Sequence, residues 1–129
     1  MTQDHVTGHC LCGETSFTYR PPERFMVHCH CESCRRATAS GFTSFIGVRD
    51  GQWRWTGRPV AQYQSSPGVH RSFCSRCGTQ MAFQSAKYPG EIHFYAATLS
   101  DPTHFKPTTH VHTDEMLSWI HLDDGLPQK

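Results

Sequence analysis

The sequence has few of the residues that fill protein cores. Leucine, isoleucine, valine and phenylalanine together account for 22 of its 129 residues, about 17%. So low a fraction is typical of a disordered chain only when the net charge is large, and here the formal net charge is +1. We therefore expect a folded chain whose small hydrophobic core needs additional cross-links for stability.

Charge of one sign and long apolar runs are also missing. A net charge of +1 argues against a broad phosphate-binding surface, so nucleic acid is an unfavoured partner. The longest apolar stretches, such as Phe25-Met26-Val27, fall far short of the roughly 20 residues that cross a membrane. The chain shows no basic segment followed by an apolar one at its start, which is the pattern of a secretory signal. We predict a soluble, cytoplasmic protein in which residues 1–129 form a single domain.

Several common catalytic motifs are absent as well, but cysteine is plentiful. The chain has no common glycine-rich nucleotide loop, no H-E-x-x-H pair and no G-x-S-x-G elbow. A disulfide framework fits the cysteines poorly, because their number is odd and a reducing cytosol keeps thiols free. We interpret them as metal ligands. They form three groups: Cys10 and Cys12; Cys29, Cys31 and Cys34; and Cys74 and Cys77.

The first and last groups have the spacing of one closed metal site. Cys10 and Cys12 would present two sulfurs on one face of an extended strand. Cys74 and Cys77 would span a tight turn, and Gly78 after them permits the positive φ that such a turn often needs. Two pairs far apart in sequence are how a four-cysteine zinc site joins distant loops. Metal binding would then contribute to folding.

The middle group offers three sulfurs and so leaves a tetrahedral ion one open position, as in catalytic zinc sites. Cys29 and Cys31 would share a strand face, and Cys34 would follow a turn that could begin a short helix. Alternatively, a second closed site takes a fourth ligand from His28, His30 or another of the ten histidines. An extended run puts those two histidines on the face opposite the sulfurs. An iron–sulfur cluster is a further alternative.

Outside the cysteine groups, the pattern predicts β-strands. Thr15, Phe17 and Tyr19 alternate with polar residues, and Asp50-Gly51 is a turn signal between later strands. No segment has a sustained helical period, so we expect only short helices. The tail from Asp114 should form a short helix or a strand, with Met116, Trp119 and Ile120 in the core. The further strands are predicted over residues 42–48, 53–55, 60–64, 69–73, 81–84 and 92–99.

Three segments together are specific enough to indicate a family. They read Gly8-His9-Cys10-Leu11-Cys12-Gly13, His28-Cys29-His30-Cys31-Glu32-Ser33-Cys34-Arg35 and Phe73-Cys74-Ser75-Arg76-Cys77-Gly78. In this order they resemble the glutathione-dependent formaldehyde-activating family, which also includes the centromere protein V domain. The resemblance runs from Gly8 to about Pro127. It implies a zinc-stapled β-tent, an all-β fold of several short antiparallel sheets with at most short helices.

The same resemblance implies the ligand sets and an activity. It assigns a structural zinc to Cys10, Cys12, Cys74 and Cys77 and a catalytic zinc to Cys29, Cys31 and Cys34, which makes two ions per chain. The implied reaction adds glutathione, a small thiol, to formaldehyde, a small electrophile. It gives S-hydroxymethylglutathione and is classed with the carbon–sulfur lyases.

Elementary chemistry supports a thiol as the substrate of an open three-cysteine zinc. Three thiolates give that ion a formal charge of −1, so it suits binding a thiol more than making hydroxide. Arg35 or a nearby histidine is the expected donor to the developing oxyanion. The alternative function is a non-catalytic, zinc-ribbon-like binding module for a protein or nucleic-acid partner.

Overall fold

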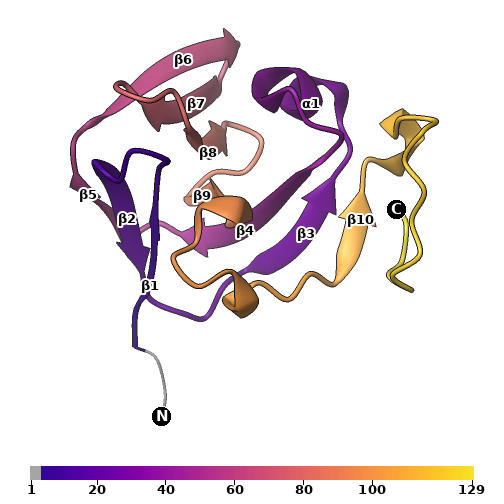
Figure 1. Cartoon of the computed structure of the whole chain (residues 1–129), viewed down its shortest axis with the longest axis horizontal. Helices are drawn as coiled ribbons and strands as arrows, with labels where there is room; N and C mark the ends of the chain where they lie inside the picture. Colours follow the sequence, from indigo (N-terminus) through magenta and orange to yellow (C-terminus); the bar gives the residue numbers. More distant parts are fainter. Residues whose placement is uncertain (1–3) are drawn as a thin grey trace.

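Strands are the main secondary structure of the protein. A computed structural model describes residues 4–129, and Figure 1 shows their arrangement. In that part of the chain the one α-helix, α1 (Glu32–Thr38), has seven residues, and the other helical segments are short 3₁₀ turns. No helix there is long and apolar enough to span a membrane. The prediction of an all-β fold with short helices is confirmed.

The first sheet has three antiparallel strands. Its order is β1 (Val6–His9), β2 (Thr15–Tyr19) and β5 (Trp53–Gly57), and it lies at the left of Figure 1. The predicted alternation is present, because Thr15, Phe17 and Tyr19 of β2 are buried while the residues between them are partly exposed. A one-sided sheet of this kind must cover its apolar face with another layer.

The second sheet has seven strands in the order β10-β3-β4-β9-β8-β7-β6. Neighbouring strands are antiparallel, except that β10 runs parallel to β3. The bounds are β3 (Phe25–Cys29), β4 (Thr43–Arg49), β6 (Val60–Ser66), β7 (Val69–Cys74), β8 (Gln80–Ser85), β9 (Glu91–Tyr95) and β10 (Thr109–Val111).

The main core lies between the two sheets. Phe17 of β2 stacks on Phe94 of β9 with ring centroids 3.9 Å apart, and both side chains are fully buried. The ring of Phe17 also covers Gly8 of β1, where any side chain would clash with it. Because this core uses only one face of the seven-stranded sheet, the other face is free to carry a site.

Strand β9 is shorter than the sequence predicts. It ends at Tyr95, and Ala96–Thr98 form a 3₁₀ turn, η1. The hydroxyl of Thr98 donates to the carbonyl of Tyr95 at 2.8 Å, which turns the chain away from the sheet. Leu99, predicted to continue the strand, instead makes a β-bridge with Gly8 of the other sheet.

The C-terminal segment lies beside β10, at the right of Figure 1. After the 3₁₀ turn η3 (Thr113–Glu115), the tail has no regular helix or strand apart from a bridge between Gln128 and His110. The prediction that Trp119 belongs to the core is wrong, since that side chain is 65% exposed. Ile120 is half-buried against Gly41, and the edge of the Trp119 ring also reaches this glycine, so the tail covers the loop before β4 although most of the tryptophan stays exposed.

Candidate metal centres

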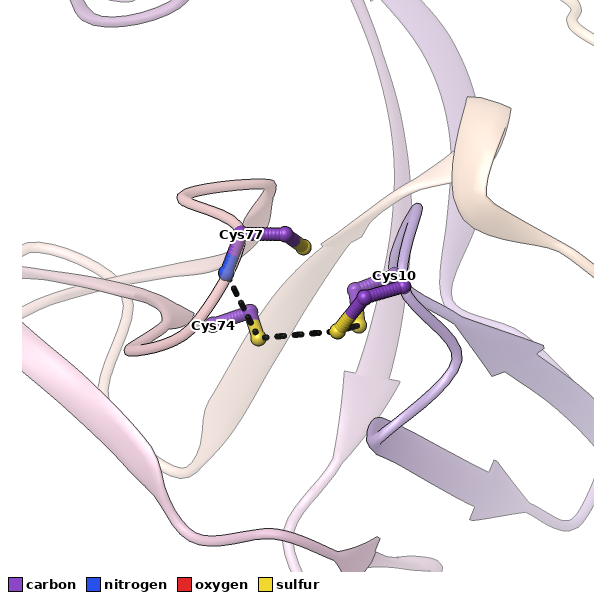
Figure 2. Close-up of side chains that lie close together, drawn as sticks. Cys10, Cys74 and Cys77 are labelled. Atoms are coloured by element: carbon purple, nitrogen blue, oxygen red, sulfur yellow. Dashed lines mark hydrogen bonds between the residues drawn. The ribbon is translucent and has the colours of Figure 1, made fainter.

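Four of the predicted ligands converge between the two sheets. Cys10 and Cys12 lie on the loop that follows β1, and Cys74 and Cys77 lie at the end of β7. Their sulfurs are all within 4.8 Å of one another. Figure 2 shows the loop after β1 and the turn after β7 facing each other through Cys10, Cys74 and Cys77. A metal ion at this position would join the three-stranded sheet to the seven-stranded one.

The sulfur–sulfur distances fit a zinc ion. Sγ of Cys12 is 3.5 Å from that of Cys10 and 3.8 Å from that of Cys74, and all seven cysteines are free thiols. A disulfide would need about 2.05 Å. Four thiolates at about 2.3 Å from a tetrahedral zinc ion lie about 3.8 Å apart. These residues therefore match a closed zinc site in both donor type and spacing.

The first pair reaches this arrangement by a turn, not by the extended strand that we predicted. The strand ends at His9, and the N–H of Gly13 donates to the carbonyl of Cys10 at 3.1 Å. Gly13 has φ +82°, which a residue with a side chain rarely adopts. The turn brings the N–H of Thr15 to 3.3 Å from Cys10 Sγ, where it stabilises a thiolate. A straight strand could not supply that hydrogen bond.

The second pair repeats this construction, as the sequence predicted. The N–H of Gly78 donates to the carbonyl of Cys74 at 2.9 Å, and Gly78 has φ +80°. The N–H groups of Arg76 and Cys77 both point at Cys74 Sγ, each at 3.4 Å. Two similar turns, one from each sheet, thus direct their sulfurs and amide dipoles to a common point.

Thr79 connects the two loops. Its hydroxyl oxygen accepts a hydrogen bond from the N–H of Leu11 at 3.1 Å and lies 3.2 Å from Cys77 Sγ. Chiefly through that hydroxyl, the pKa of the Cys77 thiol falls to about 5. Sequence reasoning did not single out Thr79, because a threonine two residues after a cysteine has no signal of its own.

The remaining three cysteines form a second cluster on the other face of the seven-stranded sheet. Cys29 ends β3, Cys31 is the extended residue before α1, and Cys34 lies in the first turn of that helix. Their sulfurs lie within 4.8 Å of one another. The helix begins at Glu32, two residues before Cys34, whereas the sequence predicted a turn up to Cys34 and a helix only from there. This early start brings Cys34 back toward the end of β3.

The second cluster holds three donors and no fourth. Within residues 4–129, no histidine, aspartate or glutamate joins these sulfurs to complete a set of four. Hydrogen bonds from Cys29 and Cys34 hold the pKa of the Cys31 thiol far below its ordinary value, so this group readily carries a thiolate. A soft, partly ionised set of three sulfurs suits zinc and leaves one position for another ligand.

A buried arginine lies against this cluster. Arg71 of β7 is 3% exposed, and its Nη1 lies 3.8 Å from Cys34 Sγ and 3.3 Å from the hydroxyl of Tyr95. Its guanidinium also lies 5.1 Å from the ring centre of Phe83. A buried cation needs a negative partner, and Arg71 makes no salt bridge to a carboxylate of the described residues. Three thiolates with a bound Zn²⁺ would carry a formal charge of −1, which Arg71 could neutralise.

The histidines around Cys29 are turned away from the sulfurs, as an extended run requires. His28 shares a 2.8 Å hydrogen bond with Ser44, and His30 Nε2 lies 2.8 Å from Nδ1 of His110. His110 in turn bonds Asp124 at 2.7 Å. The alternative in which His28 or His30 completes the second site is therefore wrong. These rings pack on one another between β3, β10 and the C-terminal segment.

Arg35, the expected oxyanion donor, has a different position. Its Nε donates to the carbonyl of His30 at 3.3 Å and its Nη2 to the carbonyl of Glu115 at 3.2 Å. It therefore ties α1 to the C-terminal segment. The arginine nearest the sulfurs is Arg71, which the sequence did not indicate, because a single arginine within a strand pattern usually lies on the surface.

Two cavities meet at the three-cysteine cluster. A wide groove of about 1270 Å³ runs between α1 and strands β6–β8, and an apolar pocket of about 270 Å³ lies over β3 and β4. Cys31, Ser33 and His112 line both cavities, while Cys29 and Cys34 line the smaller one. A ligand of the three sulfurs is thus accessible from two directions.

The fold and the two clusters together define a small all-β protein with two cysteine groups that could each bind a metal ion. A sequence model of the glutathione-dependent formaldehyde-activating enzyme family matches residues 5–115. The chain belongs to that family. The resemblance carried by the three cysteine segments is therefore confirmed.

Individual relatives agree with this assignment. The chain is 33% identical over 76 residues to an uncharacterised lyase of Schizosaccharomyces pombe, a match covering 59% of this chain and 55% of that protein. It is 25% identical over 128 residues to a putative glutathione-dependent formaldehyde-activating enzyme of Halomonas elongata, covering 92% and 81%. The chain thus spans about half the length of the first relative and most of the second.

A solved structure has the same fold. The crystal structure of a Rhodobacter sphaeroides protein superposes with a TM-score of 0.62 over 95% of this chain and 99% of that one. The two sequences are 19% identical. The likeness therefore concerns the arrangement of strands alone.

Proposed function

We propose that this chain is a carbon–sulfur lyase-type enzyme that joins a small thiol, glutathione or a similar compound, to a small electrophile such as formaldehyde. The reaction takes place at a zinc ion held by Cys29, Cys31 and Cys34. A second zinc ion, held by Cys10, Cys12, Cys74 and Cys77, stabilises the fold. The free thiols suit a reducing compartment such as the cytoplasm.

One observation carries this proposal: three cysteines line a cavity with no fourth protein ligand among the described residues. Structural zinc sites are closed, whereas catalytic sites leave a position open. The chain offers both kinds, because its other four cysteines form a complete set. The family's name and those of its relatives point to the same class of reaction.

Zinc bound by three thiolates would supply a position at which an incoming thiol is held as its thiolate at neutral pH. The chain's own residues then prepare the reaction. Arg71, beside Cys34, would neutralise the formal −1 charge of the zinc site and so limit the free-energy cost of burying that charge. Because the guanidinium is held by Ser65 at 3.1 Å and by Tyr95 at 3.3 Å, this charge is fixed in place.

The wide groove provides room for a peptide-like thiol. Its lining includes the cations Arg36 and Lys87 and the carboxylates Glu32 and Glu115. Arg36 is paired through Nε with Glu32 at 2.8 Å, so Lys87 is the cation that we assign to a carboxylate of glutathione. Tyr63 and Tyr88 contribute apolar surface in the same groove. A thiol anchored there has its sulfur directed toward Cys31, so addition becomes a reaction between two positioned groups.

The electrophile would meet the sulfur where the two cavities join. The sulfur–carbon bond forms as the C=O double bond becomes a single bond, and the oxygen takes up a proton. His112 lines both cavities and lies on the turn η3 side of the cluster, so we assign the proton donation to its imidazole. The oxyanion donor expected among nearby histidines is then His112, not Arg35.

Metal analysis combined with thiol titration tests the proposal. We expect about two zinc ions per chain, and replacement of the zinc in the three-cysteine site by Co²⁺ should give a spectrum that changes on addition of glutathione. Proton NMR should detect S-hydroxymethylglutathione forming faster than in the uncatalysed mixture. A protein that binds zinc but leaves the Co²⁺ spectrum unchanged with every small thiol would instead be the non-catalytic binding module.

A further inference from the structure

The smaller cavity is built for an apolar group. Its volume is about 270 Å³, and it lies on the seven-stranded sheet directly beside the three cysteines. Phe25 of β3 and His93 of β9 line it, and they are separated in the sheet by Gly47 of β4, which pairs with both. Because Gly47 has no side chain, the ring of Phe25 lies flat over the sheet there. Phe45, Phe83, Val27 and Val111 complete the apolar walls.

One polar side chain of this lining already has a partner. His93 is buried, and its Nε2 lies 2.7 Å from a carboxylate oxygen of Glu91. Its ring packs edge-on against Phe25 at 4.8 Å and against the tilted ring of Phe83 at 5.4 Å. The pocket therefore presents mainly aromatic rings and valine methyl groups to a guest. Its polar lining consists of the three cysteines, Ser33, Tyr88, His93 and His112.

The size of the cavity does not match formaldehyde, which has no substituent to place there. An apolar cavity of about 150 Å³ is enough to hold benzene, and water is poorly retained in a cavity without polar partners. The pocket's volume of about 270 Å³ includes the space beside the sulfurs that a zinc ion and the thiol sulfur would take, and the remainder has room for a ring or a branched alkyl group. Such a group would gain from leaving water, whereas formaldehyde would leave the pocket unfilled.

We propose that the preferred electrophile of this chain is an aldehyde carrying an aromatic or branched aliphatic substituent. This inference rests on the proposed function and specifies its substrate class. The substituent occupies the pocket over β3 and β4, and the carbonyl group lies at the mouth beside Cys31. The reaction is RSH + R′CHO → RS–CH(OH)R′. In the net reaction the thiol loses its proton, the carbonyl oxygen gains one from His112, one sulfur–carbon bond forms as the C=O double bond becomes single, and no oxidant or reductant is consumed.

Binding of an unreactive probe tests the pocket without relying on turnover. Benzyl alcohol cannot form the adduct but fits the same space. We expect it to bind the zinc-loaded protein in the millimolar range or tighter, with saturation transfer by NMR to its ring protons. Val111→Phe should abolish that signal, and Val27→Phe provides a second filling variant should the first fail to fold. Absence of binding to the wild-type protein would overturn the inference.

Competition between two aldehydes tests the preference itself. With glutathione as the thiol, kcat/KM for phenylacetaldehyde should exceed that for formaldehyde by about tenfold or more, since each methylene in an apolar pocket contributes roughly 10–200-fold. Val111→Phe should reduce that ratio at least tenfold. Leu117→Phe likewise introduces a phenyl ring, but outside both cavities, on the tail, and should leave the ratio unaltered.

These results separate the two proposals. Catalysed adduct formation with formaldehyde, together with an aldehyde ratio below one and no probe binding, would overturn the pocket inference and leave the proposed function intact. Absence of catalysed adduct with either aldehyde, in a protein that binds benzyl alcohol, would overturn the proposed function and with it the substrate assignment. Binding with the expected ratio supports both.

Discussion

The guanidinium group of Arg71 lies 3.8 Å from the sulfur of Cys34, inside the protein and away from any carboxylate in the described part of the chain. Burial alone would lower the pKa of Arg71, but the negative charge that Tyr95 and Cys34 can carry more than offsets this and raises it. The arginine therefore stays charged, and its natural partner is the anionic cysteine cluster. This pairing makes the second cluster sensitive to a residue that is not a ligand.

Replacing Arg71 by methionine should weaken the second metal site. The variant keeps an unbranched apolar stem but leaves the −1 charge of a zinc–trithiolate site buried without a cation. Loss of an outer partner of this kind typically costs 10–100-fold in metal affinity. In competition with a zinc-binding dye, the variant should give up the zinc ion of the three-cysteine site at a dye concentration about 10–100-fold lower than the wild type does, and should keep the other ion. Arg54→Met, on the exposed side of β5, is the matched control and should retain both ions.

The same cysteine-to-serine change should have opposite effects at the two clusters. Cys31→Ser should give a folded protein with about one zinc ion and no adduct formation, because the closed site still joins the sheets. Cys77→Ser should lose the closed site and much of the stability, since structural zinc binding is itself folding energy. Thermal unfolding by circular dichroism and zinc analysis measure both. Unfolding of Cys31→Ser with a stable Cys77→Ser would reverse the roles assigned to the clusters.

Stability should depend strongly on the stacked rings between the sheets. Phe17→Ala removes a fully buried ring whose centroid lies 3.9 Å from that of Phe94. We expect a loss of about 3–5 kcal/mol in the free energy of unfolding, measured by urea denaturation of the zinc-loaded protein. Leu11→Ala removes a side chain that is 88% exposed, so its effect should stay within about 0.5 kcal/mol. Equal effects of the two changes would contradict this account of the core.

The carboxylate of Glu23 should make the protein sensitive to acid. Burial alone would raise the pKa of Glu23, but hydrogen bonds from His104 at 2.6 Å and Tyr19 at 2.8 Å more than offset it and lower the pKa below its ordinary value of 4.5. A lowered folded-state pKa gives stability that is complete above the unfolded-state value and is lost as the pH falls through the folded-state value.

Glu23→Gln isolates this contribution. The difference in unfolding free energy between wild type and variant should be larger at about pH 5.5 than below about pH 4.5, because it shrinks as Glu23 becomes protonated. Urea midpoints measured at several pH values give that difference directly. Protonation of zinc ligands affects both proteins alike and cancels in the comparison. A difference that grows as the solution becomes more acidic would contradict the assigned sign.

The ligand sets could be predicted from sequence because cysteine spacing is local. Cys10 and Cys12, like Cys74 and Cys77, are close enough in the chain that a short turn brings their sulfurs together. The backbone conformation that carries Cys10 and Cys12 was less predictable. An extended strand and a tight turn both place residues i and i+2 near one point, and only the turn supplies N–H groups to the sulfurs. The spacing therefore identified the donors but not the backbone that presents them.

Strands could be predicted where apolar and polar residues alternate along the chain. The burial of residues that contact other strands could not. Strand β2 lies where Thr15, Phe17 and Tyr19 predicted it, since alternate burial depends on neighbours along the chain. Arg71 is different, because its burial comes from Phe83 and Tyr95 on other strands. The parallel pairing of β10 with β3 likewise depends on a contact 80 residues apart, between His30 and His110. That residues 1–129 form a single domain stays a prediction.

The four-cysteine cluster also constrains the order of events while the protein is being made. Cys74 follows Cys12 by 62 residues. At a translation rate of about 5–20 residues per second, the first pair is synthesised roughly 3–12 s before its partners. During that interval Cys10 and Cys12 are an incomplete chelator, open to oxidation or to capture of another soft metal. Newly synthesised chains would therefore be most vulnerable to copper or cadmium stress before residue 77 emerges.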